Sequence, residues 1–197
     1  MRHTNYSKAE TLEEVHEINK STWGYNLTQR YNDLMDCAKE CETIKELDIN
    51  QGSSLVALLM CKPKHITGID ITLSAWKNGS NDGGPGLEER AIKYCEKNNI
   101  KLETMECSSI DPKCASEVDM LHIDSLHNAG HLAQELQLHG PLVKKYIVFH
   151  DTAVNNYELY NEVKRWISNN PGWAEKKHYH ISPDGRCVGH LVIEKIL

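Results

Sequence analysis

Aspartates and histidines stand where predicted strands end, at spacings that could support acid–base or metal chemistry. The segment VDMLHIDSLH (118–127) begins as an apolar strand and then places Asp124 and His127 three residues apart. A second apolar run, 144–151, ends on His150 and Asp151. A histidine can act as a general base near neutral pH, and a carboxylate can bind a cation. The elements around these residues decide whether the four side chains meet.

Those elements alternate between short apolar strands and helices. We expect strands over 43–49, 65–71, 101–107, 118–124 and 144–151, and helices over about 8–20, 27–41, 87–98, 128–138 and 156–169, with one more that starts at a capping Ser53 or Ser54. The Pro-Asp-Gly turn between 175–182 and 186–196 predicts a C-terminal antiparallel hairpin. The segment SAWKNGSNDGGPG (74–86) predicts a loop.

This order predicts an α/β fold: a Rossmann-like, doubly wound, mostly parallel seven-stranded sheet with helices on both faces and a C-terminal antiparallel hairpin. We expect one domain over residues 1–197, in which residues 1–41 form a helical cap and residues 42–197 form the core. Sheets of this kind bind ligands at the carboxyl ends of their strands. Asp124 and His150 follow or end such strands, so we expect them at one edge of the sheet.

Composition and charge narrow the class of partner. The chain has 22 Lys and Arg against 28 Asp and Glu, a formal charge of −6, which argues against a non-specific nucleic-acid binder. No apolar run approaches the roughly 20 residues that span a bilayer, and the first residues lack the apolar core of a signal peptide. We therefore expect a cytoplasmic protein with a small-molecule partner and no membrane partner. The sequence allows a homodimer.

The seven cysteines do not suggest a disulfide framework or a zinc ribbon. Their number is odd and no Cys-x-x-Cys pair occurs. We expect ordinary reduced cysteines that pack as small apolar residues. They stand at positions 37, 41, 61, 95, 107, 114 and 187.

Two features of the first strands are candidates for binding a nucleotide-like ligand. In ELDINQGSS (46–54), a glycine and two serines between a strand and a helix can bring backbone N–H groups close to a ligand. The alternative is an ordinary turn. Asp70 ends the next strand, 24 residues after Glu46, where an acid can accept hydrogen bonds from both ribose hydroxyls. The alternative is an aspartate that caps a turn.

Together these segments resemble the class I S-adenosylmethionine-dependent methyltransferases, and among them the small-molecule O-methyltransferases. The family pattern E-x-G-x-x-x-G-x-S corresponds to ELDINQGSS, and D-x-x-F-I-D-G-D-H-S-Y corresponds to DMLHIDSLHNAG (119–130). The strand that ends in IVFHDT (147–152) also matches, and the resemblance covers about residues 40–196. It implies an enzyme that methylates a small molecule, at a hydroxyl oxygen, with S-adenosyl-L-methionine as its cofactor.

The resemblance also implies roles for individual residues. The methionine part of the cofactor would lie against residues 46–54, the ribose against Asp70, and the adenine near Ser108 and Ser109. Asp124 would face the sulfonium or a metal, and His127 would take the proton from the acceptor hydroxyl. The cofactor-binding residues expected in this way are Glu46, Asp48, Asn50, Gly52, Ser53, Ser54, Asp70, Ser108, Ser109 and Asp124.

Some relatives bind a divalent cation, and the resemblance places its ligands at Asp124, His150 and Asp151. Magnesium prefers oxygen ligands, whereas an imidazole suits manganese or iron better. We therefore expect Mg, Mn or Fe, or no metal if the segment HDT (150–152) only caps a turn. Asp48 and Asn50 depart from the family by replacing glycines. A degenerate S-adenosylmethionine-binding protein, and a hydroxylase or lyase of the same fold, are therefore the alternatives.

Other histidines and tryptophans have weaker assignments. His122 alternates with apolar positions, so we expect it to pack or bond internally. His178 and His180 share one face of a late strand, where they line an acceptor pocket or face solvent. Trp23 and Trp76 are candidates for a lid over the cofactor or the acceptor.

Overall fold

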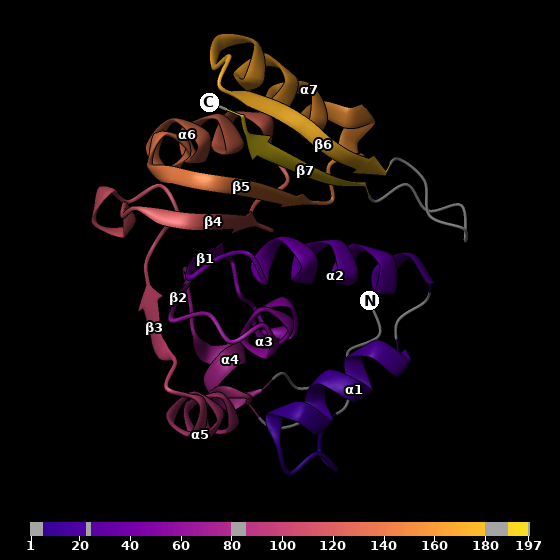
Figure 1. Cartoon of the computed structure of the whole chain (residues 1–197), viewed down its shortest axis with the longest axis vertical. Helices are drawn as coiled ribbons and strands as arrows, with labels where there is room; N and C mark the ends of the chain where they lie inside the picture. The colour runs from indigo at the N-terminus through magenta and orange to yellow at the C-terminus, as the bar shows by residue number, and fades with distance from the viewer. Residues whose placement is uncertain (1–5, 23–24, 80–85, 180–188, 197) are drawn as a thin grey trace.

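A seven-stranded sheet with the strand order β3-β2-β1-β4-β5-β7-β6 runs through the molecule (Figure 1). It is seen in a computed structural model that describes residues 6–22, 25–79, 86–179 and 189–196. The strands β1 to β5 pair in parallel, and β7 is antiparallel to both of its neighbours, β5 and β6. The predicted mostly parallel sheet with a terminal antiparallel hairpin is therefore confirmed.

The elements lie close to their predicted places. The strands are β1 Thr43–Leu47, β2 His65–Asp70, β3 Lys101–Glu106, β4 Val118–Ile123, β5 Val143–His150, β6 Trp173–Tyr179 and β7 His190–Lys195. The helices are α1 Leu12–Thr22, α2 Tyr25–Ala38, α3 Ser53–Met60, α4 Ser74–Asn78, α5 Glu88–Asn98, α6 Ala129–His139 and α7 Val154–Asn169, with short 3₁₀ turns at Pro112–Cys114 and Gly140–Leu142. The predicted Pro-Asp-Gly turn of the hairpin lies outside the described residues. In the part of the chain that is described, no helix is both long and apolar enough to cross a membrane.

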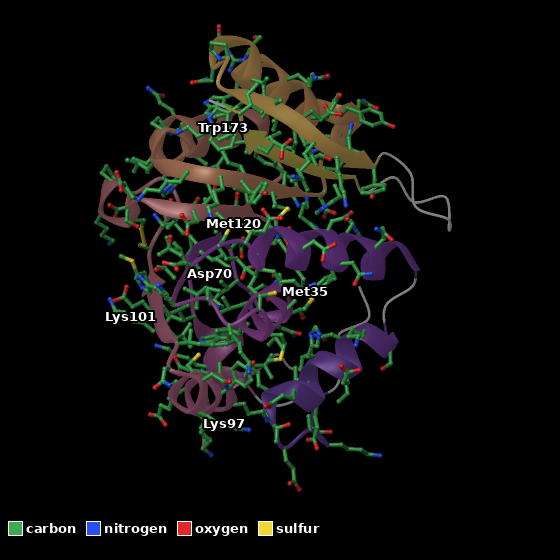
Figure 2. The ribbon with its side chains drawn as sticks, in the orientation of Figure 1. Met35, Asp70, Lys97, Lys101, Met120 and Trp173 are labelled. Atoms are coloured by element: carbon green, nitrogen blue, oxygen red, sulfur yellow. A yellow bond between two sulfur atoms is a disulfide. The ribbon has the colours of Figure 1, made fainter. Side chains whose placement is uncertain are left out.

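The sheet separates two apolar layers because successive residues of a strand point to opposite faces. The layer that includes Ile44, Met120 and Val148 packs against α1, α2, α3 and α5, and we call this side the α2 face. The other layer, on the α6 face, packs against α6 and α7. Figure 2 labels one residue of each layer, Met120 of β4 in the layer on the α2 face and Trp173 of β6 in the layer on the α6 face. The predicted helices on both faces are therefore confirmed.

The predicted loop over 74–86 is partly wrong, because its first residues form α4. Trp76 on this helix is fully buried. Its ring packs so tightly under Gly52 that a Cβ there would lie 2.3 Å from the Trp76 Cζ3 atom. Gly52 also has a φ of 86°, in the left-handed region that favours glycine. Trp76 therefore supports the 46–54 loop from below and is not a lid, and Trp23 lies outside the described residues.

The expectation of reduced cysteines is wrong for two of them. Cys107 and Cys114 form a disulfide that closes the turn after β3. This turn folds back through a hydrogen bond from the Asp111 N–H to the Ser108 carbonyl, which brings the two cysteines together. The cysteines at 37, 41, 61 and 95 are free, and Cys187 lies outside the described residues.

Candidate active site

A row of polar side chains crosses the carboxyl end of the sheet on the α2 face. The register pairs the last core residues of β2, β1, β4 and β5 with one another, so the residues that follow them are neighbours too. The same register pairs His150 of β5 with His190 of β7, and His190 with Tyr179 of β6. From β2 to β6, the row is Asp70, Asp48, Asp124, His150, His190 and Tyr179.

The structure brings together the four residues that first suggested chemistry. The Nδ1 atom of His150 lies 3.1 Å from Asp124 Oδ1 and 2.9 Å from Asp151 Oδ1. The Nε2 atom of His127 lies 3.4 Å from Asp151 Oδ2. Asp151 is buried and has a φ of 52°, and this left-handed backbone turns its carboxylate back toward the strand ends. Two aspartates and two imidazoles therefore share one small region.

The charges in this region are coupled. Burial acts to lower the pKa of His150, but the carboxylates of Asp124 and Asp151 outweigh burial and raise that pKa. Burial acts to raise the pKa of Asp124, and His150 outweighs it and lowers that pKa. The two carboxylates therefore favour the protonated form of His150, which partly compensates their negative charge.

The same residues offer a donor set for a metal ion. One ligand atom each from Asp124, His127 and Asp151 lies within 4.8 Å of the others. Two carboxylates and an imidazole suit manganese or iron better than magnesium. The converging set contains His127 in place of the expected His150, because His150 Nδ1 stands between the two aspartates as their ion-pair partner. Metal binding stays a prediction.

The loop at the carboxyl end of β1 takes glycine-like backbone conformations without glycines. Asp48 and Asn50 have φ values of 68° and 44°, which aspartate and asparagine tolerate better than other residues. The Asp70 carboxylate accepts hydrogen bonds from the N–H groups of Asn50, at 2.8 Å, and Thr72, at 3.0 Å. The turn-capping role of Asp70 is thus confirmed, and its ribose role stays a prediction. Burial, together with the neighbouring Asp70 carboxylate, raises the pKa of Asp48 to about 7.

Glu46 and His122 form a buried pair beneath this row. Glu46 is fully buried, and its Oε1 atom is 2.9 Å from His122 Nδ1. The Ser54 hydroxyl donates to the same carboxylate oxygen. The expected internal role of His122 is confirmed. Because Glu46 is engaged inside the protein, it holds Ser54 and the start of α3 in place.

The start of α3 can bind an anionic group. Gly52 is its N-cap and offers no side-chain acceptor to the first N–H groups of the helix. Such groups attract carboxylates, and the helix dipole adds to the attraction. The Ser53 hydroxyl lies 3.0 Å from the Tyr6 hydroxyl, so the N-terminal segment lies against this helix start. The expected role of this loop in binding the methionine part of the cofactor stays a prediction.

Ser109, one of the two serines expected near the adenine, belongs to a second cluster. Ser109 Oγ is 3.0 Å from His131 Nε2, and Glu135 Oε1 is 3.2 Å from the same nitrogen. The Ser125 hydroxyl donates to Glu135 Oε2 at 2.8 Å, and His139 Nε2 is 2.8 Å from the Ser109 carbonyl oxygen. Because Ser109 and Glu135 share one ring nitrogen, the histidine cannot relay a proton between them as in a catalytic triad.

Sequence reasoning missed the α6 members of this second cluster. His131, Glu135 and His139 are four residues apart, so they line one side of the helix, and this spacing was the available signal. Their position beneath Ser109 leaves Ser108 as the more accessible of the two serines expected near the adenine.

Sequence reasoning also missed the contribution of α2. Arg30 Nη1 lies 3.7 Å from Asp151 Oδ1, and both side chains are buried. Lys177 of β6 pairs with Asp33, so α2 is joined to the hairpin as well as to the active region. Burial and the carboxylates of Glu46 and Asp124 raise the pKa of Tyr31 well above 10, which keeps the phenol neutral beside them. No motif marked these residues, because α2 precedes every segment that carries the resemblance.

Comparison with protein families identifies a match over most of the chain. The family described as Rhamnosyl O-methyltransferase/CmcI matches residues 42–186, which include β1 to β6, the α6 cluster and every residue of the row except His190. A search of curated proteins with this sequence finds no match.

Several solved structures share the fold at low sequence identity. An O-methyltransferase from Bacillus cereus in complex with SAH has a TM-score of 0.63 and 13% identity, over 95% of this chain and 91% of its own. The N-methyltransferase NodS from Bradyrhizobium japonicum has a TM-score of 0.55 and 13% identity, over 85% and 94%. An SAH-bound methyltransferase from Podospora anserina has a TM-score of 0.55 and 12% identity, over 97% and 90%. The chain belongs to the Rhamnosyl O-methyltransferase/CmcI family and is an S-adenosylmethionine-dependent methyltransferase of small molecules.

Proposed function

We propose that this enzyme methylates a hydroxyl oxygen at the carboxyl ends of β4 and β5. The observation that carries the proposal is the convergence of Asp124, His127 and Asp151 at that edge, with one ligand atom of each within 4.8 Å of the others. The bound cofactor would supply a methyl group on a sulfonium; the acceptor oxygen would bond to this methyl carbon and S-adenosylhomocysteine would be the leaving group. The protein has to hold the acceptor in line with that methyl group and remove the proton from its hydroxyl.

His127 is the proposed general base. Its side chain is 40% exposed, so an acceptor hydroxyl can reach the imidazole. Asp151, at 3.4 Å from Nε2, orients the ring and stabilises the imidazolium that forms when the proton is taken. The fully buried His122 cannot play this part, because Glu46 already occupies its Nδ1.

The carboxylates on β2, β1 and β4 are proposed to receive the cofactor. Asp70 lies at the ribose position, and Asp124 faces the positive sulfonium. The uncapped start of α3 takes the methionine carboxylate. Asp48 places a carboxyl group beside the proposed cofactor contacts, where the glycine of the family pattern would have no side chain.

Asp124 and Asp151 are also proposed to hold a divalent cation, with His127 as the third ligand. The cation would act as a Lewis acid on the acceptor oxygen. A histidine that binds a metal through a ring nitrogen cannot take a proton on that nitrogen. His127 is therefore either ligand or base, and metal dependence separates the two roles.

Calorimetry with S-adenosylmethionine and S-adenosylhomocysteine, followed by a panel of hydroxylated acceptors analysed by mass spectrometry, tests this function. We expect binding of both compounds and a mass gain of one methyl group on an acceptor oxygen. Failure of both compounds to bind would overturn the proposal.

Treatment with EDTA, then addition of Mn²⁺, Fe²⁺ or Mg²⁺ in turn, tests the metal. Unchanged turnover after EDTA, with no metal retained, removes the cation and leaves His127 as base.

A further inference from the structure

The chain after β5 takes a backbone conformation that its residues do not favour. Asn155, Asn156 and Tyr157, at the start of α7, have φ values of 50°, 56° and 66°, so three consecutive residues are left-handed. Residues with a side chain avoid this region, and asparagine and aspartate usually enter it singly. The segment AVNNYELY (153–160) contains no glycine or proline that would produce such a turn. Contacts outside the three residues therefore hold it in place.

The left-handed residues form the exposed tip of a closed loop. The Tyr160 N–H donates to the Thr152 carbonyl oxygen at 3.2 Å and so joins the two ends of the loop. Thr152 and Leu159 are buried at its base. Asn155 and Asn156 are exposed at its tip. Backbone strain at an exposed tip above a buried base is of the kind that functional sites retain.

The tip contacts the turn that carries the proposed base. The Asn155 side-chain amide donates a hydrogen bond from Nδ2 to the His127 carbonyl oxygen at 3.1 Å. The same segment of chain supplies Asp151, whose Oδ2 atom lies 3.4 Å from His127 Nε2. Residues 151–155 therefore hold His127 at two points, the ring through Asp151 and the backbone through Asn155.

The two ends of the turn that carries His127 are fixed to α6. The Ser125 hydroxyl donates to Glu135 Oε2 at 2.8 Å, and the Asn128 side chain caps the helix. His127 lies between these two anchors, with a side chain that is 40% exposed. The Asn155 contact ties the middle of the turn to the segment after β5. It therefore fixes where the imidazole stands above the ends of β4 and β5.

We propose that Asn155 is a positioning residue for His127, and that the left-handed turn 155–157 brings its amide to the His127 carbonyl. Right-handed backbone at these residues would turn the Asn155 side chain in another direction. The inference rests on the proposed function, because it needs His127 to act in catalysis, as base or as metal ligand. A misplaced imidazole lowers the rate even when every ligand still binds, since the reacting groups have to be aligned.

Matched glycine variants test this role by steady-state kinetics with an acceptor from the panel. Asn155→Gly removes the amide and still allows the left-handed backbone. Asn156→Gly makes the same change at the next left-handed residue, for which the described part of the chain shows no contact with His127. Asn155→Gly should lower kcat about tenfold, with KM and affinity for S-adenosylhomocysteine unchanged. Asn156→Gly should keep the wild-type kcat, and Asn155→Gln, which keeps an amide donor, should recover part of the loss.

A double variant separates positioning from stability. If Asn155 acts through His127, Asn155→Gly should cause no further loss of kcat in the His127→Ala background. A residue that only stabilises the fold would cause the same loss in both backgrounds. Thermal melts of all variants show whether the changes in kcat come from unfolding.

Hydrogen exchange tests the contact on the free protein, without an acceptor. Peptides that cover residues 124–130 should exchange their amide hydrogens about tenfold faster in Asn155→Gly than in wild type, because the middle of the turn has lost its tie. The same peptides should exchange at the wild-type rate in Asn156→Gly.

Three results overturn the inference: wild-type exchange of residues 124–130 in Asn155→Gly, wild-type kcat in Asn155→Gly, or a loss of kcat that is equally large in the His127→Ala background. Failure of the proposed function is a separate result, because it appears as loss of S-adenosylhomocysteine binding or as full turnover in His127→Ala. In that case the exchange comparison still shows whether Asn155 holds the turn.

Discussion

Two histidine–glutamate pairs, each with a fully buried glutamate, lie on opposite faces of the sheet and have similar chemistry. His122 is 2.9 Å from Glu46 on the α2 face, and His131 is 3.2 Å from Glu135 on the α6 face. Both glutamates are fully buried, and each accepts a hydrogen bond from a serine hydroxyl. Residue type and burial therefore cannot tell which pair serves catalysis.

The difference lies in what surrounds each pair. The Glu46 pair lies beneath Asp48 and Asp124, at the strand ends where two more histidines and Asp151 converge. The Glu135 pair instead joins α6 to the turns after β3 and β4 through Ser109 and Ser125. The first pair supports a site that binds charged ligands, and the second fixes loops to a helix.

The largest expected difference is between two histidines close to the carboxyl edge. His127→Ala should lower turnover about 10²–10⁴-fold, the usual effect of losing a general base, without changing affinity for S-adenosylhomocysteine. His131→Ala should leave turnover per folded molecule within a few-fold but lower the melting temperature. Steady-state kinetics and thermal melts of both variants measure this. Equal losses of turnover would show that the α6 region is catalytic as well.

The next largest effect concerns Asp70. Asp70→Ala should weaken cofactor binding about tenfold to a hundredfold, because it removes a charged acceptor for the ribose hydroxyls. It also removes the acceptor for the N–H groups of Asn50 and Thr72, so some affinity can be lost through the loop alone. Asp70→Asn is the control, since its amide oxygen still accepts one of these bonds. If calorimetry gives wild-type affinity for both folded variants, Asp70 does not contact the cofactor.

The sequence predicted the mostly parallel sheet with its terminal hairpin and the position of Asp124 and His127 at one edge of it, because these depend on alternation and chain order. It did not predict that Trp76 is buried, since a short helix in a glycine-rich stretch resembles a loop. The Trp76 ring is buried because it fills the space beneath Gly52, a contact that only the folded structure shows. Arg30 and His190 were also missed. Their position beside the site comes from tertiary packing: α2 crosses from the other end of the sequence, and β7 sets His190 beside His150 by antiparallel pairing.

The pH dependence of stability tests the α6 region. Burial lowers the pKa of His139 to about 4, below the 6.5 of an exposed histidine. The unfolded chain therefore binds more protons between those values, and the stability is present above pH 6.5 and lost as the pH falls toward 4. His139→Gln should remove about 2 kcal/mol of the loss between pH 7 and pH 5.

Urea titrations of wild type and His139→Gln at several pH values measure this loss. The difference between the two proteins should be constant above pH 7, where His139 is neutral in both states. A difference that is also constant from pH 7 to pH 5 would show that His139 titrates alike in the folded and unfolded chain.

The smallest effects come from a matched pair of serines, one for each buried glutamate. Ser54→Ala and Ser125→Ala each remove a hydroxyl that donates to a buried carboxylate, so each should lower the free energy of unfolding by about 1–2 kcal/mol. Only Ser54 also lies in the loop proposed to hold the cofactor, at the start of α3. Ser54→Ala should therefore reduce affinity for S-adenosylhomocysteine several-fold as well, whereas Ser125→Ala should not.

Urea unfolding and calorimetry on the two variants give both quantities. Equal losses of stability with a loss of affinity in Ser54→Ala alone support the division between a ligand-binding face and a structural face. A loss of affinity in Ser125→Ala would instead mean that Glu135 and its partners form part of the cofactor site. The two histidine–glutamate pairs would then act on the same ligand from the two faces of one sheet.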